Sequence, residues 1–70
     1  MDNRNKDNVG KRVKNLHVFC PGFYMIPAGT VFTVTRRSYP LGYDITSDPH
    51  PKTGRVYKLQ NRSLERFEEV

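Results

Sequence analysis

The sequence predicts a small all-β domain of five short strands. Short runs of β-branched and aromatic residues recur along the chain, and such residues fit a pleated, half-buried surface. Turn signals rich in proline, glycine and asparagine separate these runs about every 8–12 residues. Such a pattern is typical of a small closed barrel or a two-sheet sandwich. A barrel would also remove the exposed strand edges that a small β protein must protect.

The length and the cysteine content limit how the domain is stabilised. The chain has 70 residues, which is enough for one domain with a thin core, because a domain of this size buries only ~60% of its unfolded surface. Cys20 is the only cysteine. An intramolecular disulfide is therefore excluded, and no Cys/His cluster offers a structural zinc site. We expect the four phenylalanines and four tyrosines to supply much of the core.

The first residues are expected to lie outside this domain. Residues 1–8 contain three asparagines and two aspartates, and Met1 is their only large apolar residue. Such a segment buries too little apolar surface to offset the entropy lost on ordering. We expect a flexible polar tail over residues 1–8 and a single domain over residues 9–70.

Two interpretations remain open for the next segment. A strand from Arg12 to Phe19 would place Leu16 and Val18 on one face. The spacing of the apolar residues Val9, Val13 and Leu16 suits a helix face instead. A short helical turn within residues 9–16 is therefore the alternative to strand.

A long apolar loop follows a proline–glycine turn at residues 21–22. It contains four consecutive large apolar residues, Phe23, Tyr24, Met25 and Ile26. Four such residues exceed what one strand face can bury. The loop either covers one end of the core or presents an exposed patch to a partner, and in that case we expect Tyr24 and Met25 at the interface.

The middle of the chain predicts two adjacent strands. Thr30–Arg37 is the clearest strand, with Phe32 and Val34 on one face. A turn containing proline and glycine then leads to a short alternating strand over residues 43–47. Tyr43 and Ile45 are expected to point inward from it.

The last third predicts a loop, two strands and a turn. Two prolines make residues 48–54 an exposed loop. Residues 55–60 form the next predicted strand, with Tyr57 and Leu59 inward and Lys58 outward. The spacing of Leu64, Phe67 and Val70 predicts one 3₁₀ turn running into a last short strand.

Over residues 12–70 the chain resembles small SH3-like barrels. The resemblance is carried by the strand Gly29-Thr30-Val31, entered from a proline-containing loop, and by a later strand, Val56 to Leu59, followed by Ser63-Leu64-Glu65. In size and in these motifs the chain is also similar to small phage or prophage proteins. The resemblance implies a five-stranded SH3-like barrel that binds peptides, nucleic acids or other domains and is not an enzyme. The chain has no tryptophan and is basic, so the resemblance does not extend to binding proline-rich peptides.

Residues with catalytic or metal-binding chemistry do not form a recognisable site. His17 and Cys20 are three residues apart, which on a strand places them on opposite faces. Asp44 and Asp48 would stand ~13 Å apart on a strand, too far for a pair of glycosidase carboxylates. We therefore expect no enzyme activity, no metal and no cofactor.

The distribution of charge points to an anionic partner. The formal net charge is +5, and residues 17–64 hold six basic against two acidic residues. Cations interleaved with aromatic rings suit nucleic acid, with cations on phosphates and rings under bases. The expected contact residues are Arg36, Arg37, Tyr39, Tyr43, Lys52, Arg55, Lys58 and Arg62. Arg36 and Arg37 point to opposite faces of their strand, so at most one joins a patch with Arg55 or Lys58.

The leading hypothesis is a non-enzymatic module that binds nucleic acid or another anionic surface. The alternative is a small adaptor or inhibitor that binds a host or viral protein through Phe23–Ile26 or a strand edge. A homodimer through an edge strand is also open. The lone cysteine, the lack of a membrane-spanning apolar run and the polar N-terminus predict a cytoplasmic protein, in the host cell if phage-encoded.

Overall fold

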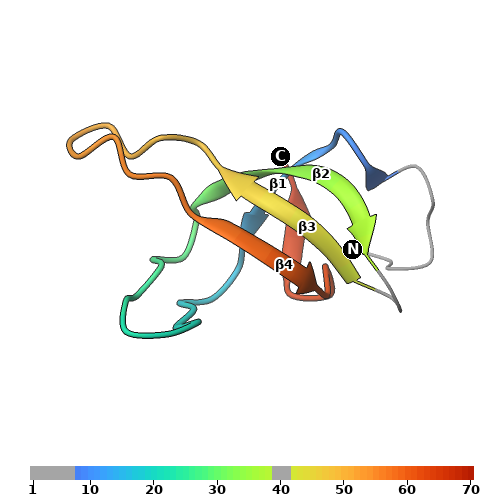
Figure 1. Ribbon diagram of the computed structural model, residues 1–70, viewed down its shortest axis with the longest axis horizontal. Helices are drawn as coiled ribbons and strands as arrows, with labels where there is room; N and C mark the ends of the chain where they lie inside the picture. Colours follow the sequence, from blue (N-terminus) through green and yellow to red (C-terminus); the bar gives the residue numbers. More distant parts are fainter. Residues whose placement is uncertain (1–7, 39–41) are drawn as a thin grey trace.

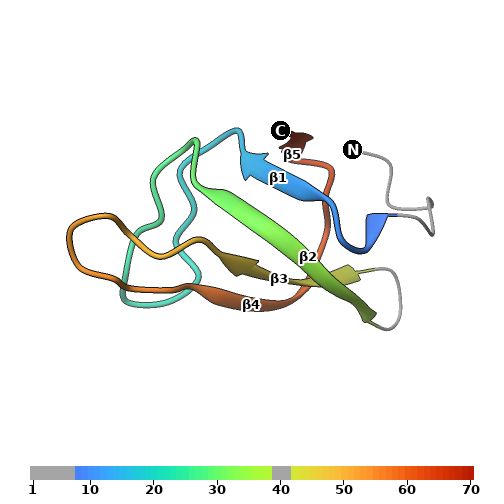
Figure 2. The same ribbon diagram turned by 90° about the horizontal axis from the view of Figure 1, so that it is seen from above.

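The computed structural model describes residues 8–38 and 42–70, and these residues form an all-β fold without an α-helix. Five antiparallel strands make one sheet in the order β4-β3-β2-β1-β5. Figures 1 and 2 show the arrangement of the strands in two perpendicular views. The strands are β1 (Arg12–Asn15), β2 (Val31–Ser38), β3 (Gly42–Ser47), β4 (Lys58–Arg62) and β5 (Phe67–Glu69). The all-β prediction is confirmed. The sheet is not closed, because β4 and β5 lie at its two edges without pairing.

The longest strand joins the two ends of the sheet. β2 pairs with β1 through residues 31–33 and with β3 through residues 32–38. β1 in turn pairs with β5, which brings the beginning and the end of the domain together. In Figure 2, β2 crosses between the β1–β5 pair and the β3–β4 pair.

The core lies on one face of this sheet and takes residues from every strand. Phe32 and Val34 of β2 and Tyr43 and Ile45 of β3 are buried, as their alternation predicts. The Phe32 ring meets Phe67 of β5 edge-on, with centroids 5.8 Å apart. The buried apolar residues are Val13, Ile26, Phe32, Val34, Tyr43, Ile45, Leu59, Leu64 and Phe67.

The predicted extent of the first strand, from Arg12 to Phe19, is wrong. β1 ends at Asn15, and its buried residues are Val13 and Asn15, whereas Leu16 is 42% and Val18 56% exposed. The physical reason is the Asn15 side chain. Its Nδ2 donates to the carbonyls of His17 and Pro27, and its Oδ1 accepts from the Thr30 amide at 2.8 Å. The buried amide thereby holds both ends of the following loop and ends the strand.

A turn precedes β1, as the alternative interpretation of residues 9–16 allowed. The Lys11 amide donates to the Asn8 carbonyl at 3.1 Å, which closes one tight turn. Asn8 itself, the last residue of the expected tail, is 1% exposed. The other residues of the expected tail lie outside the described residues.

An irregularity in the β2–β3 ladder changes which face Arg36 occupies. The register pairs Val34 with Ile45 and then Arg36 with Asp44, so Thr35 is an extra residue in β2. Without it, Arg36 would share the inward face of Phe32 and Val34. The bulge turns Arg36 outward beside Asp44.

Residues 48–57 between β3 and β4 form the predicted exposed loop, although the predicted strand start at Arg55 is wrong. His50 organises the loop. Its amide donates to the Arg55 carbonyl at 2.9 Å, and its Nδ1 accepts from the amides of Lys52 and Thr53. These bonds favour a closed tip over a strand, and β4 begins only at Lys58. Within β4, Leu59 is buried and Lys58 exposed, as predicted.

The turn before the last strand follows the predicted spacing. The Phe67 amide donates to the Leu64 carbonyl at 3.0 Å, and β5 begins at Phe67. Leu64 and Phe67 are buried, whereas Val70 is exposed after the strand has ended.

Candidate binding surface

The predicted cationic residues do not form one patch, because the sheet separates them. Arg36 points to the outer face, where its Nε lies 2.6 Å from an Asp44 carboxylate oxygen. Lys58 lies opposite Thr46 and adjoins the inward Leu59, so it also points outward. Both residues therefore belong to a polar outer face, on the side away from the core.

The remaining predicted contacts are dispersed or buried. Arg37 is exposed near the end of β2, and Lys52 is exposed at the tip of the 48–57 loop. Tyr39 lies outside the described residues. Tyr43 is 0% exposed, so its predicted role in stacking on a base is wrong. Its inward position in β3 places the ring in the core, where the Asn8 amide approaches its hydroxyl at 3.5 Å.

Among the described residues, Arg55 is one of two arginines whose guanidinium groups lie over aromatic rings. Tyr24 and Tyr57 stack with their centroids 5.4 Å apart and their planes 15° from parallel. The Arg55 guanidinium carbon lies 4.8 Å from the Tyr24 centroid and 5.3 Å from that of Tyr57. Ser47 helps to hold this arrangement, because its Oγ accepts from the Tyr57 amide at 2.7 Å. An exposed guanidinium is thus seated on two half-buried rings.

Arg62 repeats this arrangement at the other end of β4. Its guanidinium carbon lies 4.9 Å from the Phe19 centroid. Phe19 is positioned by two backbone hydrogen bonds with Ile26, of 3.0 and 2.7 Å, inside the long loop between β1 and β2. The Nε of Arg62 is buried and has no hydrogen-bond partner in the described part of the chain.

We call these five residues the arginine–aromatic strip: Phe19, Tyr24, Arg55, Tyr57 and Arg62. Neither arginine of the strip forms an ion pair with any residue in 8–38 or 42–70. Tyr57 and Arg62 are five residues apart, which spans at most about 16 Å in an extended strand. The left-handed backbone of Asn61, with φ 54°, shortens this distance to roughly 15 Å. The strip therefore offers two uncompensated cations, each on an aromatic surface, along one edge of the sheet.

The sequence predicts both arginines of the strip as contact residues. Of its three rings, it predicts only Tyr24 as a contact, and at the alternative interface. A signal for the second ring existed, because Tyr57 follows Arg55 by two residues, a spacing that places both on one side of an extended segment. No comparable signal links Arg62 to Phe19, which are 43 positions apart in sequence and meet only through the fold.

The Phe23–Ile26 loop both covers the core and exposes apolar side chains. Ile26 is fully buried, and Tyr24 packs against the core from outside. Phe23 is fully exposed, and Met25 is 62% exposed. The expectation of Met25 on an exposed patch is consistent with this geometry, whereas Phe23 is more exposed than Tyr24.

The side chains considered for catalysis or metal binding have other partners or stand apart. Asp44 pairs with Arg36, and Asp48 pairs with Arg12. No group of three histidine, cysteine or carboxylate residues converges within the described ranges. Those ranges also contain no helix long and apolar enough to cross a membrane.

Comparisons with protein-family models, with curated proteins and with solved structures found no match to this chain.

Proposed function

We propose that the chain is a non-enzymatic module that binds single-stranded nucleic acid through the arginine–aromatic strip. The observation that carries the proposal is the seating of Arg55 and Arg62 on aromatic rings without ion-pair partners among the described residues. An unpaired guanidinium attracts phosphate, and its plane and the adjacent rings can stack with bases.

The dimensions and energetics of the strip suit a short single strand. Stacked bases are spaced about 3.4 Å along one strand, so a strip of roughly 15 Å accommodates on the order of four nucleotides. Each stacked base contributes about 1–3 kcal/mol with little sequence preference. Bases in a duplex are already stacked on one another, so the strip favours a single strand over double-stranded nucleic acid.

We also propose that the fold is a small SH3-like barrel. The proposal is supported by β2 pairing with both β1 and β3, by β5 pairing with β1, and by the tight turn at Leu64 before β5. A barrel brings the two edge strands toward each other across the core. Nuclear Overhauser contacts between side chains of β4 and β5 would support the barrel, and a β4 edge remote from β5 would contradict it.

A second candidate function is favoured by the exposed apolar side chains of the loop. Phe23 and Met25 lie outside the core on a loop that Ile26 anchors. Aromatic residues and methionine are enriched in protein interfaces. A protein adaptor would bind through these residues, and its binding would survive high salt, whereas binding of nucleic acid weakens steeply as salt rises.

Charge reversal at the strip and on the outer face tests whether the strip is the surface that binds nucleic acid. Arg55→Glu changes the strip, and Lys58→Glu makes the same charge change on the outer face. We expect fluorescence anisotropy with a labelled single-stranded oligonucleotide at about 50 mM salt to show at least tenfold weaker binding for Arg55→Glu and a smaller loss for Lys58→Glu. Equal losses of affinity in the two variants would show that the strip is not the binding surface. No binding by the unmodified protein under these conditions would overturn the nucleic-acid function itself.

A further inference from the structure

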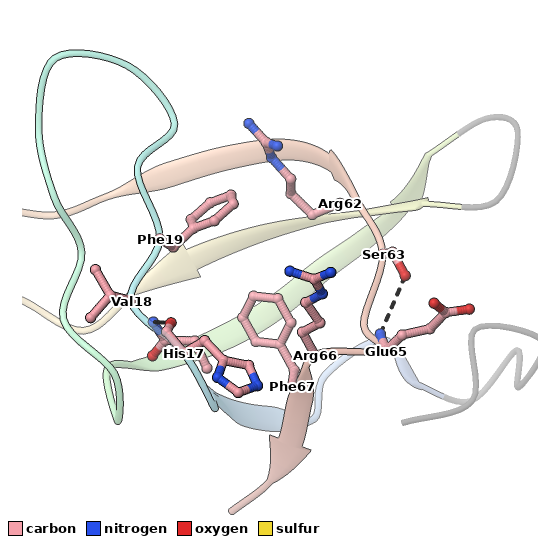
Figure 3. A pocket seen from close by; sticks show the side chains of 9 residues that line it. His17, Val18, Phe19, Arg62, Ser63, Glu65, Arg66 and Phe67 are labelled. Atoms are coloured by element: carbon pink, nitrogen blue, oxygen red, sulfur yellow. Dashed lines mark hydrogen bonds between the residues drawn. The ribbon is translucent and has the colours of Figure 1, made fainter.

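A pocket of about 250 Å³ adjoins one end of the strip, between the segment that follows β1 and the turn that leads into β5. Phe19 and Arg62 of the strip line it together with Phe67, Arg66, His17 and Val18 (Figure 3). The pocket therefore shares two residues with the strip and adds a second aromatic ring and a second arginine.

The two rings give the pocket firm aromatic walls. Phe67 is 7% exposed and is fixed by its edge-on contact with Phe32, so its position is set by the core. The backbone of Phe19 is held by two hydrogen bonds to Ile26, and its ring packs against the Arg62 guanidinium. Rings held in this way lose little conformational entropy when a flat ligand packs against them.

The charges around the pocket are mainly positive. The Arg62 side chain lies beside the Phe19 ring and the Arg66 side chain beside the Phe67 ring (Figure 3). Neither forms an ion pair within residues 8–38 and 42–70. The one carboxylate nearby, that of Glu65, points away from both rings (Figure 3). A ligand that combines a flat aromatic group with a negative charge is complementary to this surface.

We propose that this pocket holds one nucleotide of the bound strand, with its base against Phe19 and Phe67 and its phosphate between Arg62 and Arg66. The inference rests on the proposed function. It adds to that function a specific site for one base at the end of the strip. The neighbouring nucleotides would then continue along the strip toward Tyr57 and Arg55.

A mononucleotide tests the pocket separately from the strand. In amide-resolved NMR titrations, thymidine 5′-monophosphate should shift the amides of Phe19, Arg62, Arg66 and Phe67 in a saturable way. Thymidine alone and inorganic phosphate alone should bind at least about fivefold more weakly, because each lacks one of the two recognised groups. Inorganic phosphate binding as well as the nucleotide would reduce the pocket to an anion site and overturn the assignment of a base. Nucleotide-induced shifts confined to other residues, or none, would also overturn it.

A pocket variant and a control variant on the outer face complete this test. Comparison with oligonucleotide binding separates failure of the pocket proposal from failure of the proposed function. Arg66→Ala removes an exposed pocket cation and should weaken the nucleotide at least about fivefold, whereas Lys58→Ala on the outer face should leave it unchanged. If a single-stranded oligonucleotide still binds through Arg55 while Arg66→Ala has no effect on either ligand, the pocket proposal alone is wrong. If the oligonucleotide does not bind at all, the proposed function is wrong as well.

Discussion

At the scale of single residues, Asn15 has a structural role that its residue type does not suggest. An asparagine inside a predicted strand is unfavourable by propensity, yet this side chain is 4% exposed and makes three hydrogen bonds to loop backbone. Those bonds end β1 and fix both ends of the loop that carries Phe19 and Tyr24. A buried polar residue thus positions two rings of the strip.

Replacing Asn15 with alanine should destabilise the fold by about 2–3 kcal/mol, because buried backbone groups of the loop lose their partners. The free energy of unfolding in urea measures this effect. Leu16→Ala is the matched control, since Leu16 is the exposed neighbour and its truncation should change stability by less than about 0.5 kcal/mol. Equal effects of the two substitutions would contradict the role given to Asn15.

Gly42 is a second residue with a specific structural role, and in this case the role is steric. A Cβ added there would lie 2.7 Å from the carbonyl carbon of Asn61 and 2.9 Å from its Cα, both backbone atoms of β4. Gly42→Ala should therefore destabilise the protein by more than about 1 kcal/mol, as overpacking typically does. Gly22→Ala places its Cβ no closer than 4.0 Å to the side chain of Tyr24 and serves as the neutral control. Thermal unfolding of both variants distinguishes the two sites, and an unchanged midpoint for Gly42→Ala would refute the clash.

At the scale of elements, Asp44 links three neighbouring strands. Its carboxylate pairs with Arg36 of β2 and accepts a hydrogen bond from the Asn61 amide of β4 at 3.1 Å. The Arg36 side chain is 74% exposed, so solvent screens the ion pair and the hydrogen bond to the backbone dominates.

Two substitutions at Asp44 separate these contributions. Asp44→Asn keeps an acceptor for the Asn61 amide and should reduce stability by no more than about 1 kcal/mol. Asp44→Ala removes both interactions and should reduce it by about 1.5–3 kcal/mol. Chemical unfolding compares them, and a larger loss for asparagine than for alanine would contradict this division.

Strand positions with regular alternation could be predicted from the sequence, whereas irregular positions could not. Phe32, Val34 and Ile45 alternate with polar residues, and they are buried as predicted. The bulge at Thr35 has no sequence signal that distinguishes it, so the outward position of Arg36 was not predictable. The β1 error has the same origin, because hydrogen bonds of Asn15 to a distant loop override the local pattern.

At the scale of the whole molecule, the sheet distributes the basic residues over two different faces. Arg36 and Lys58 lie on the outer face, and Arg55 and Arg62 lie against rings of the loop between β1 and β2. Composition predicts the positive charge but does not predict this division. It depends on which rings the long loop brings to β4, and those contacts join residues up to 43 positions apart.

The two edges of the sheet bear on the homodimer that the sequence leaves open. β4 carries Lys58 and Arg62 and is irregular opposite β3, and such features disfavour pairing with another strand. β5 has only three residues. We expect a monomer by light scattering at micromolar concentration, and a dimer that Lys58→Val strengthens would indicate pairing through β4.

The most direct test of the strip is to identify which residues touch the bound strand. Photo-crosslinking of a single-stranded oligonucleotide containing 5-bromodeoxyuridine, followed by mass spectrometry of the peptides, reports contact with individual aromatic side chains. The predicted result is crosslinking at Phe19, Tyr24 or Tyr57, lost at high salt, where phosphate contacts weaken. Crosslinks only at Tyr39 or on the outer face, or none at low salt, would contradict binding through the strip.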